Sequence, residues 1–147
     1  MVLEGGYSMV KRAIATFLLF GFLAGCAGET ATTYMRDGKE YGVTDGVFRG
    51  RWWSYYERGT SFQAGQFHEE AVADFEHALQ FRSTDTWRAR TYGLHFVEYF
   101  PNRELGITYY ELGRYKEAAT LLEKSLAAID TDRAHHYLDL VKRAQIA

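Results

Sequence analysis

The feature that most constrains the fold of this chain is a set of small and aromatic residues at fixed spacing in residues 104–126, ELGITYYELGRYKEAATLLEKSL. The set consists of Gly106, Tyr109, Ala118, Leu122 and Ser125. Small side chains at this spacing allow the two helices of a hairpin to approach closely, whereas large ones fill the space between successive hairpins. Gly113 lies between the two halves, where glycine readily adopts the left-handed conformation that ends a helix. The pattern therefore predicts two antiparallel helices joined by a turn.

A second copy of this set lies upstream, in residues 51–81, RWWSYYERGTSFQAGQFHEEAVADFEHALQF. Its members are Gly59, Phe62, Ala71, Phe75 and Ala78. The turn glycine of this copy is Gly65, which follows Gly59 by six residues, whereas Gly113 follows Gly106 by seven. The spacing therefore predicts a second helix hairpin, whose turn is longer than that of residues 104–126.

Both copies resemble the tetratricopeptide repeat, a 34-residue unit with an aromatic residue, Ala and a large apolar residue at these places. The resemblance covers residues 51–147. It implies an all-α domain built as a short solenoid of antiparallel helix hairpins. The combination of an Arg-Trp-Trp-x-Tyr-Tyr stretch, an Arg-Thr-Tyr-Gly stretch and one well-matched repeat is similar to a group of bacterial repeat lipoproteins. That resemblance implies no reaction.

The two copies are not adjacent, because Gly59 and Gly106 are 47 residues apart, more than the length of one repeat. Gly93 lies 34 residues after Gly59, so the segment around it resembles a first helix that lacks a second one. Pro101 suits the first turn of the next helix and disfavours helix immediately before it. We therefore expect residues 85–99 to form an irregular helical insert. A looped segment that contacts a ligand is the alternative.

The C-terminal stretch TDRAHHYLDLVKRAQ has the periodicity of an amphipathic helix. Its apolar face consists of Ala134, Tyr137, Leu138, Val141 and Ala144. Thr131 or Asp132 can cap its start. Repeat arrays need a terminal helix that shields the last apolar surface, so we expect a C-terminal capping helix here.

The N-terminus has the features of an export signal. Lys11 and Arg12 precede the apolar run of residues 13–25, which is too short to span a bilayer comfortably. The run ends in Leu-Ala-Gly-Cys, which resembles the lipobox of bacterial lipoproteins. This resemblance implies that residues 9–25 are a cleaved signal peptide and that Cys26 is the lipid attachment site, with a diacylglycerol on its thiol. An uncleaved anchor with an incidental cysteine is the alternative.

The resemblance also implies a location in the bacterial cell envelope. Ala27 and Gly28 follow the cysteine, and without an aspartate there the lipid-anchored protein is expected at the outer membrane, facing the periplasm. Residues 1–8 fit poorly before a signal peptide, because Glu4 is acidic where such regions are basic. We expect these residues to be upstream translation that is not native.

Residues 26–50 read as a tether between the anchor and the helical domain. Five glycines lie in this segment and no helical period is visible. We expect a flexible connection with a possible small hairpin around Asp45 and Gly46. An isolated hairpin is marginal in water, so it would need to pack on the domain through Val47 and Phe48.

Charge, cysteine count and motifs argue against most kinds of chemistry. The formal net charge is −2 and no basic face stands out, so nucleic acid is not an expected partner. The five histidines show no metal-binding spacing, and glycine patterns for nucleotides or nucleophilic catalysis are absent from the sequence. We therefore expect no enzyme activity, no catalytic residues, no metal and no cofactor.

In the family that the chain resembles, the first helix of each hairpin lines a groove that holds a partner. Carried over position by position, the predicted partner groove consists of Trp53, Tyr56, Glu57, Gln63, Arg103, Glu104, Ile107 and Tyr110, with Thr60, Ala64, Phe100 and Glu111 completing the set. Aromatic residues and arginine are typical interface anchors. The alternative is that the insert packs into this groove and buries the aromatic residues as core.

The predicted function is a membrane-anchored protein–protein interaction module, a scaffold or assembly factor that binds a peptide or protein partner in the groove. Two alternatives stay open. The first is contact with peptidoglycan or exported polysaccharide through Trp52, Trp53, Tyr55 and Tyr56. The second is a structural lipoprotein that self-associates. The sequence gives neither the oligomeric state nor the identity of the partner.

Overall fold

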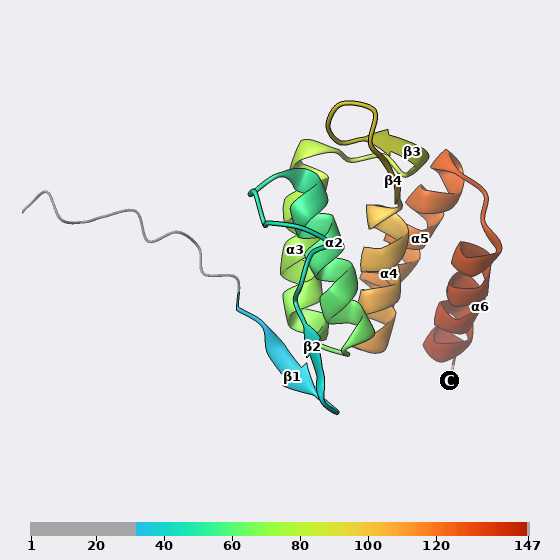
Figure 1. The fold of residues 1–147 in the computed structure, drawn as a ribbon. Coiled ribbons are helices and arrows are strands. Elements are labelled where there is room, and N and C mark those ends of the chain that lie inside the picture. Colours follow the sequence, from blue (N-terminus) through green and yellow to red (C-terminus); the bar gives the residue numbers. More distant parts are fainter. Residues whose placement is uncertain (1–31, 147) are drawn as a thin grey trace, which may run out of the picture. The chain divides into compact units, whose positions relative to one another are not determined.

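The helices of the domain stand side by side in chain order (Figure 1). The computed structural model describes residues 32–146, so the predicted signal peptide, Cys26 and residues 1–8 lie outside the described residues. The helices of the described part are α2 (Trp52–Ala64), α3 (His68–Phe81), α4 (Pro101–Glu111), α5 (Tyr115–Ala128) and α6 (Asp132–Ile146). Each helix packs on the one that follows it, which confirms helix hairpins as the main element of the fold.

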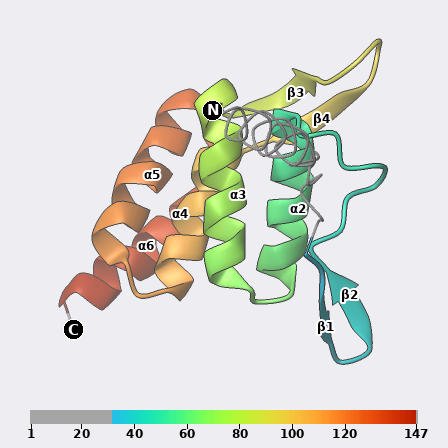
Figure 2. The same cartoon turned by 90° about the vertical axis from the view of Figure 1, so that its left-hand side faces the viewer.

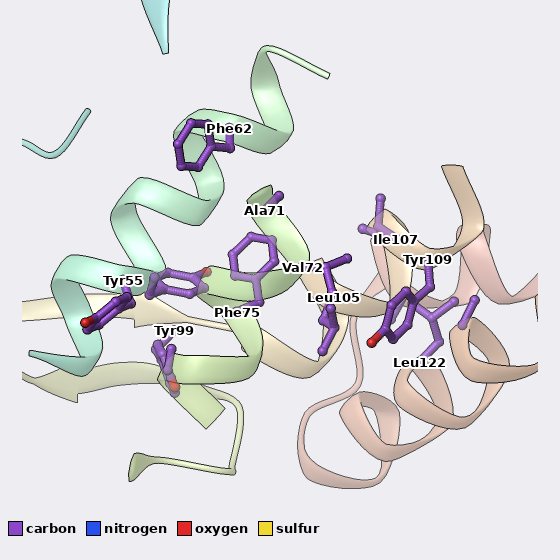
Figure 3. Close-up of a cluster of buried hydrophobic side chains, with 14 of the residues drawn as sticks. Tyr55, Phe62, Ala71, Val72, Phe75, Tyr99, Leu105, Ile107, Tyr109 and Leu122 are labelled. Carbon is purple, nitrogen blue, oxygen red and sulfur yellow. The ribbon is translucent and has the colours of Figure 1, made fainter. Parts of the chain in front are cut away.

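The two predicted sets of small and aromatic residues form the centre of the two helix hairpins. All ten members are buried: Gly59, Phe62, Ala71, Phe75, Ala78, Gly106, Tyr109, Ala118, Leu122 and Ser125. A Cβ atom on Gly59 would lie 3.0 Å from the ring of Phe75, and one on Gly106 would lie 2.9 Å from Cγ of Leu122. Figure 3 shows the labelled side chains continuing from α2 across to α5 as one row. The glycines are therefore where the helices of each hairpin touch.

The turn of the first hairpin is not longer than that of the second, so this prediction is wrong. Three residues separate the helices in both hairpins. The left-handed residue is Gly113 (φ 73°) in the second turn and Gln66 (φ 60°) in the first. Gly65 has an ordinary helical backbone, but a Cβ atom there would lie 2.5 Å from Cγ of Tyr41. This glycine is thus explained by close packing rather than by the turn.

The last helix, α6, closes the array as expected. Its buried residues are Ala134, Leu138 and Val141, and it packs against α5. Thr131 provides the N-terminal cap, because its hydroxyl accepts a hydrogen bond from the backbone N–H of Ala134 at 3.4 Å. Polar residues cover the outer face of the helix.

The insert between the hairpins is not helical, which corrects the prediction for residues 85–99. It forms two antiparallel strands, β3 (Thr86–Arg90) and β4 (Phe96–Tyr99), with Gly93 (φ 53°) in the connecting loop. Buried and exposed side chains alternate along β4, whereas Trp87 and Arg88 of β3 are both exposed, where the register shifts between Thr86 and Ala89. Aromatic and β-branched residues are common in both strands, which favours strand over helix. The repeat spacing of Gly93 is therefore coincidental, and its role is in the loop.

The described part of the predicted tether is folded onto the domain. A hairpin does form, but its strands are β1 (Tyr34–Arg36) and β2 (Lys39–Tyr41), joined by Asp37 (φ 50°) and Gly38 (φ 75°). Asp-Gly occurs twice in this segment, and the first copy has both positive φ angles that a tight hairpin turn needs. The prediction of a hairpin around Asp45 and Gly46 is therefore wrong in position.

The contacts of this segment also differ from the prediction. Tyr34 stacks on Phe67 with ring centroids 4.9 Å apart. Phe48 packs edge-on against Tyr55 at 4.9 Å, as expected, whereas Val47 is 80% exposed. Residues Ala31–Ala147 form one compact unit, so the folded domain begins well before residue 51. Within residues 32–146 no helix has the length and apolar character needed to cross a membrane.

Candidate functional site

The first helices of the two hairpins and the terminal helix line a groove of about 430 Å³. Its walls come from α2, α4 and α6 and from the first residues after α2. The lining residues are Thr60, Gln63, Ala64, Gln66, His68, Ile107, Glu111, Arg133 and Tyr137. Of the predicted set, Gln63, Ile107, Thr60, Ala64 and Glu111 lie here. The groove thus lies along the C-terminal halves of α2 and α4.

Gln63 joins the two helices at the base of this groove. Its side-chain Nε2 donates to the backbone oxygen of Glu104 at 2.9 Å and to Oγ1 of Thr108 at 3.0 Å. The hydroxyl of Thr108 in turn donates to the same backbone oxygen at 2.8 Å. The amide nitrogen of Gln63 therefore fixes the spacing of α2 and α4, and its hydrogen bonds are made within the protein itself.

The carboxylate of Glu104 connects α4 to α6 rather than facing a partner. Its side chain is only 4% exposed, and it forms ion pairs with Nε of Arg103 at 2.8 Å and with Nη2 of Arg133 at 3.1 Å. The side chain of Arg133 is 53% exposed and lines the groove. Arg133 was not predicted as a groove residue, because the sequence of α6 indicates only a capping helix and nothing in its polar face marks a position in a groove.

Tyr110 stands at the edge between α4, α5 and α6. Its ring lies 5.9 Å from that of Tyr115 and 5.7 Å from that of Tyr137. Tyr137 lines the groove, whereas Tyr110 does not line it and contacts the ring of Tyr137. Half-buried rings in contact with each other form a preorganised apolar wall for a ligand.

The N-terminal half of α2 is covered by the insert, as in the alternative interpretation. Tyr99 of β4 packs against Trp52 at 4.6 Å and against Tyr56 at 4.8 Å. Tyr56 is 8% exposed, and its hydroxyl accepts a hydrogen bond from the backbone N–H of Phe100 at 3.2 Å. Burial, followed by the charge of Glu104, raises the pKa of Tyr56. Tyr56 is therefore a core residue at this end.

Trp53 and Glu57 line a separate, smaller pocket of about 220 Å³, together with Asp45, Gly46, Val47, Arg49, Ser54, Tyr92 and His95. Tyr92 from the insert lies over Trp53 at a centroid distance of 6.3 Å. Partial burial and then the nearby Asp45 raise the pKa of Glu57. The eight predicted groove residues are thus not gathered in one place. Gln63 and Ile107 line the groove, Trp53 and Glu57 line this pocket, and Tyr56 and Glu104 are buried, whereas Arg103 and Tyr110 are half-buried and line neither.

The burial of two aromatic residues argues against glycan contact through all four residues of that alternative. Two of its four aromatic residues, Tyr55 and Tyr56, are only 8% exposed. A sugar-stacking platform needs exposed ring faces, so these two residues cannot contribute to one. In residues 32–146 no cluster of three or more His, Cys, Asp or Glu side chains is arranged to hold a metal ion.

Comparison with known families agrees with the geometry of the second hairpin. The family model described as tetratricopeptide repeat matches residues 103–129, which span most of α4 and all of α5. The chain contains a tetratricopeptide repeat. Such repeats generally mediate protein–protein interaction and are typically not enzymes. No curated protein matches the chain.

Proposed function

We propose that the chain is a membrane-anchored protein–protein interaction module of the bacterial cell envelope, a scaffold or assembly factor that holds a peptide or protein partner. The observation that carries the proposal is the groove between α2, α4 and α6, which the first helices of a tetratricopeptide array line. It joins a tyrosine wall to a carboxylate, Glu111, and a guanidinium, Arg133. This mixture suits an extended peptide that carries both apolar and charged side chains.

The sequence supports the anchor. Lys11, Arg12, the apolar run of residues 13–25 and Cys26 occur in the order of a lipoprotein signal. Two or more acyl chains hold a protein on a bilayer far more firmly than one. The anchored protein would present its groove to partners at the periplasmic side of the outer membrane.

A groove-filling variant with a matched control tests the binding site. Ala64 is the last residue of α2 and is exposed in the groove, whereas Ala128 is the last residue of α5 and is exposed outside it. A photo-crosslinking residue at position 64 should give a partner product in cells that position 128 does not give. Ala64→Trp should then lower the affinity of the identified partner by about tenfold, and Ala128→Trp should leave it unchanged.

Charge reversal provides an independent check. Glu111→Lys changes the groove, and Glu123→Lys makes the same change on the exposed face of α5. The first should weaken the crosslink and the second should not. Identical products at positions 64 and 128, or equal effects of the two reversals, would remove the groove from the proposal.

The anchor has a separate test. Cells grown with an alkyne-bearing fatty acid should incorporate it into the wild-type protein and not into Cys26→Ser, as seen by gel mobility and mass spectrometry of the N-terminal peptide. A wild-type protein that keeps residues 9–25 and carries no acyl group would contradict lipid anchoring and leave groove binding untouched.

A further inference from the structure

The hairpin of β3 and β4 carries an unusual concentration of exposed apolar side chains. It projects from the end of the helices where α2 begins (Figures 1 and 2). Leu94 is 87% exposed, Tyr92 63%, Trp87 52% and Phe96 39%. Four of the nine exposed large apolar residues in the described part of the chain therefore lie within ten consecutive positions. A monomeric protein rarely leaves such a group in water without a use for it.

Arginine accompanies these residues. Arg88 and Arg90 are exposed on β3, and the guanidinium of Arg88 lies 4.7 Å from the ring centre of Phe96. Arg90 donates from Nε to the backbone oxygen of Gly93 at 2.6 Å, which holds it beside the loop. Within residues 32–146 neither arginine forms an ion pair with a carboxylate. Their charge is available to an anionic partner.

Little negative charge opposes the two arginines. Asp85, just before β3, is only 2% exposed, and its carboxylate accepts hydrogen bonds from the backbone N–H and Nδ2 of Asn102 at 3.0 and 2.7 Å. Glu98 is the exposed acid on β4. A chain with a net charge of −2 thus presents a locally basic and aromatic surface at this hairpin.

We propose that this hairpin surface, consisting of Trp87, Arg88, Arg90, Tyr92, Leu94 and Phe96, docks on the headgroup region of a bilayer that contains anionic phospholipid. Aromatic side chains favour the interface between water and acyl chains, and each arginine near an anionic surface adds attraction. The loop with Tyr92 and Leu94 would enter the headgroup region. The arginines would lie at the level of the phosphates.

The length of the upstream chain permits this orientation. The chain enters the domain beside Phe62, about 15 Å along α2 from the contact of the hairpin with Trp52. Only Ala27 to Ala31 separate Cys26 from the first described residue, a distance of about 20 Å when fully extended. This step rests on the proposed anchor, which would keep the domain within reach of the bilayer. The groove lies along the C-terminal halves of α2 and α4, whereas the hairpin packs on their N-terminal ends at Trp52 and Phe100. Docking therefore leaves the groove open.

Vesicle flotation tests the inference with the chain from Ala27 onward, which contains the whole unit Ala31–Ala147 and lacks Cys26. It should float with vesicles of equimolar phosphatidylcholine and phosphatidylglycerol and should not float with phosphatidylcholine alone. Added salt should weaken binding, because screening shortens the reach of the arginine charges. Tryptophan fluorescence should shift to shorter wavelength on binding, and Trp87→Phe should remove this shift.

Matched variants identify the surface responsible. Leu94→Ser should lower vesicle partitioning by about tenfold, since most of a leucine side chain leaves the apolar phase. The control is Ile146→Ser, because Ile146 is also 87% exposed but lies at the end of α6. Arg88→Gln with Arg90→Gln should lower partitioning by about 25-fold, or about fivefold for each arginine. Lys142→Gln with Arg143→Gln removes two exposed cations elsewhere and should have no such effect.

Several results would overturn the inference: no flotation with anionic vesicles, equal loss in the controls, or binding to soluble dextran sulfate without binding to vesicles. Light scattering that shows a dimer abolished by Leu94→Ser, with no vesicle binding, would assign the surface to self-association instead.

The test of the docking surface can be distinguished from the test of the lipid anchor. An acylated Cys26 combined with no vesicle binding refutes only the docking surface, and vesicle binding by a chain whose Cys26 is never acylated refutes only the anchor.

Discussion

The two helix hairpins, α2–α3 and α4–α5, share the hydrogen bonds of their turns and differ in the side chains around them. Equivalent residues are 47 positions apart. In the first turn Phe67 N–H donates to the backbone oxygen of Phe62 at 3.0 Å, and in the second Arg114 N–H donates to that of Tyr109 at 2.8 Å. The family model matches the second hairpin only. A repeat geometry is thus kept by a few buried positions, even where the rest of the sequence no longer matches the family.

The clearest difference lies beside the buried glycines. In the first hairpin Arg58 and Asp74 form a double ion pair, with both N–O distances at 2.7 Å and both side chains largely buried. The equivalent positions in the second hairpin are the apolar residues Leu105 and Leu121. The guanidinium of Arg58 also lies 4.3 Å from the ring centre of Phe48. The charged pair therefore attaches the N-terminal segment, for which the second hairpin has no counterpart.

The largest expected effect comes from breaking this pair. Asp74→Leu should reduce the free energy of unfolding by about 3–5 kcal/mol, because it leaves the buried Arg58 guanidinium without its carboxylate. Arg58→Leu with Asp74→Leu, which copies the second hairpin, should return stability to within about 1 kcal/mol of wild type, since apolar pairs often replace buried ion pairs without loss. Urea unfolding followed by circular dichroism measures both. A double variant as unstable as the single one would show that the pair has no apolar substitute here.

The next effect concerns the glycines at which the helices touch. Gly59→Ala and Gly106→Ala should each cost about 1–3 kcal/mol through overpacking, despite the better helix propensity of alanine. Gly106→Ala should cost more, because its Cβ would lie 2.9 Å from Leu122 and 3.3 Å from the backbone oxygen of Ala118. Gly46→Ala is the control, since a Cβ atom there meets nothing within 4 Å. Equal urea midpoints for the three variants would refute the explanation that glycine is needed at these positions because the helices approach closely.

Exchange of the turn residues tests the left-handed position. Gln66→Gly should stabilise the protein by about 1 kcal/mol, because a residue with a side chain pays a penalty at φ 60° that glycine avoids. Gly113→Gln should destabilise it by about 1–2 kcal/mol for the same reason. The hydrogen bond from Arg36 to the Gln66 side chain at 3.1 Å is exposed and contributes little. Thermal unfolding gives the sign of each change, and a destabilising Gln66→Gly would mean that this hydrogen bond outweighs the backbone term.

This comparison also explains which parts of the fold could be predicted. The ten residues at the centres of the hairpins were predictable because only small side chains fit where two helices touch, and large apolar ones are needed to fill the space around these contacts. The prediction for Gly93 was wrong because a glycine in a strand loop and one between helices look alike in sequence. Only the aromatic and β-branched residues of β3 and β4 separate the two cases. The two Asp-Gly pairs gave equal turn signals, and the choice between them depends on packing of Tyr34 and Tyr41 against α2.

The candidate site was less predictable than the fold. Gln63 and Ile107 lie in the groove as the repeat register implied, but Tyr56 is covered by the insert and Glu104 is neutralised by Arg133 from α6. Both outcomes depend on contacts between residues far apart in the chain. A register carried over from a family cannot include an insert or a terminal helix that is particular to this chain.

The smallest effect concerns the aromatic position shared by the two hairpins, which is Phe62 in the first and Tyr109 in the second. The hydroxyl of Tyr109 donates to Oε1 of Glu76 on α3 at 2.5 Å, and burial followed by this bond raises the pKa of Tyr109 to about 12. Tyr109→Phe should cost about 1 kcal/mol at neutral pH by removing the bond. Because the unfolded chain loses this proton near pH 10, the wild type should lose stability as pH rises from about 10 to about 12. The variant should lose less stability over this pH range. Its remaining loss should come from Tyr56 and Tyr99, whose pKa values are also raised in the folded protein. Urea midpoints measured from pH 8 upward would contradict this account of Tyr109 if wild type and variant fall in parallel.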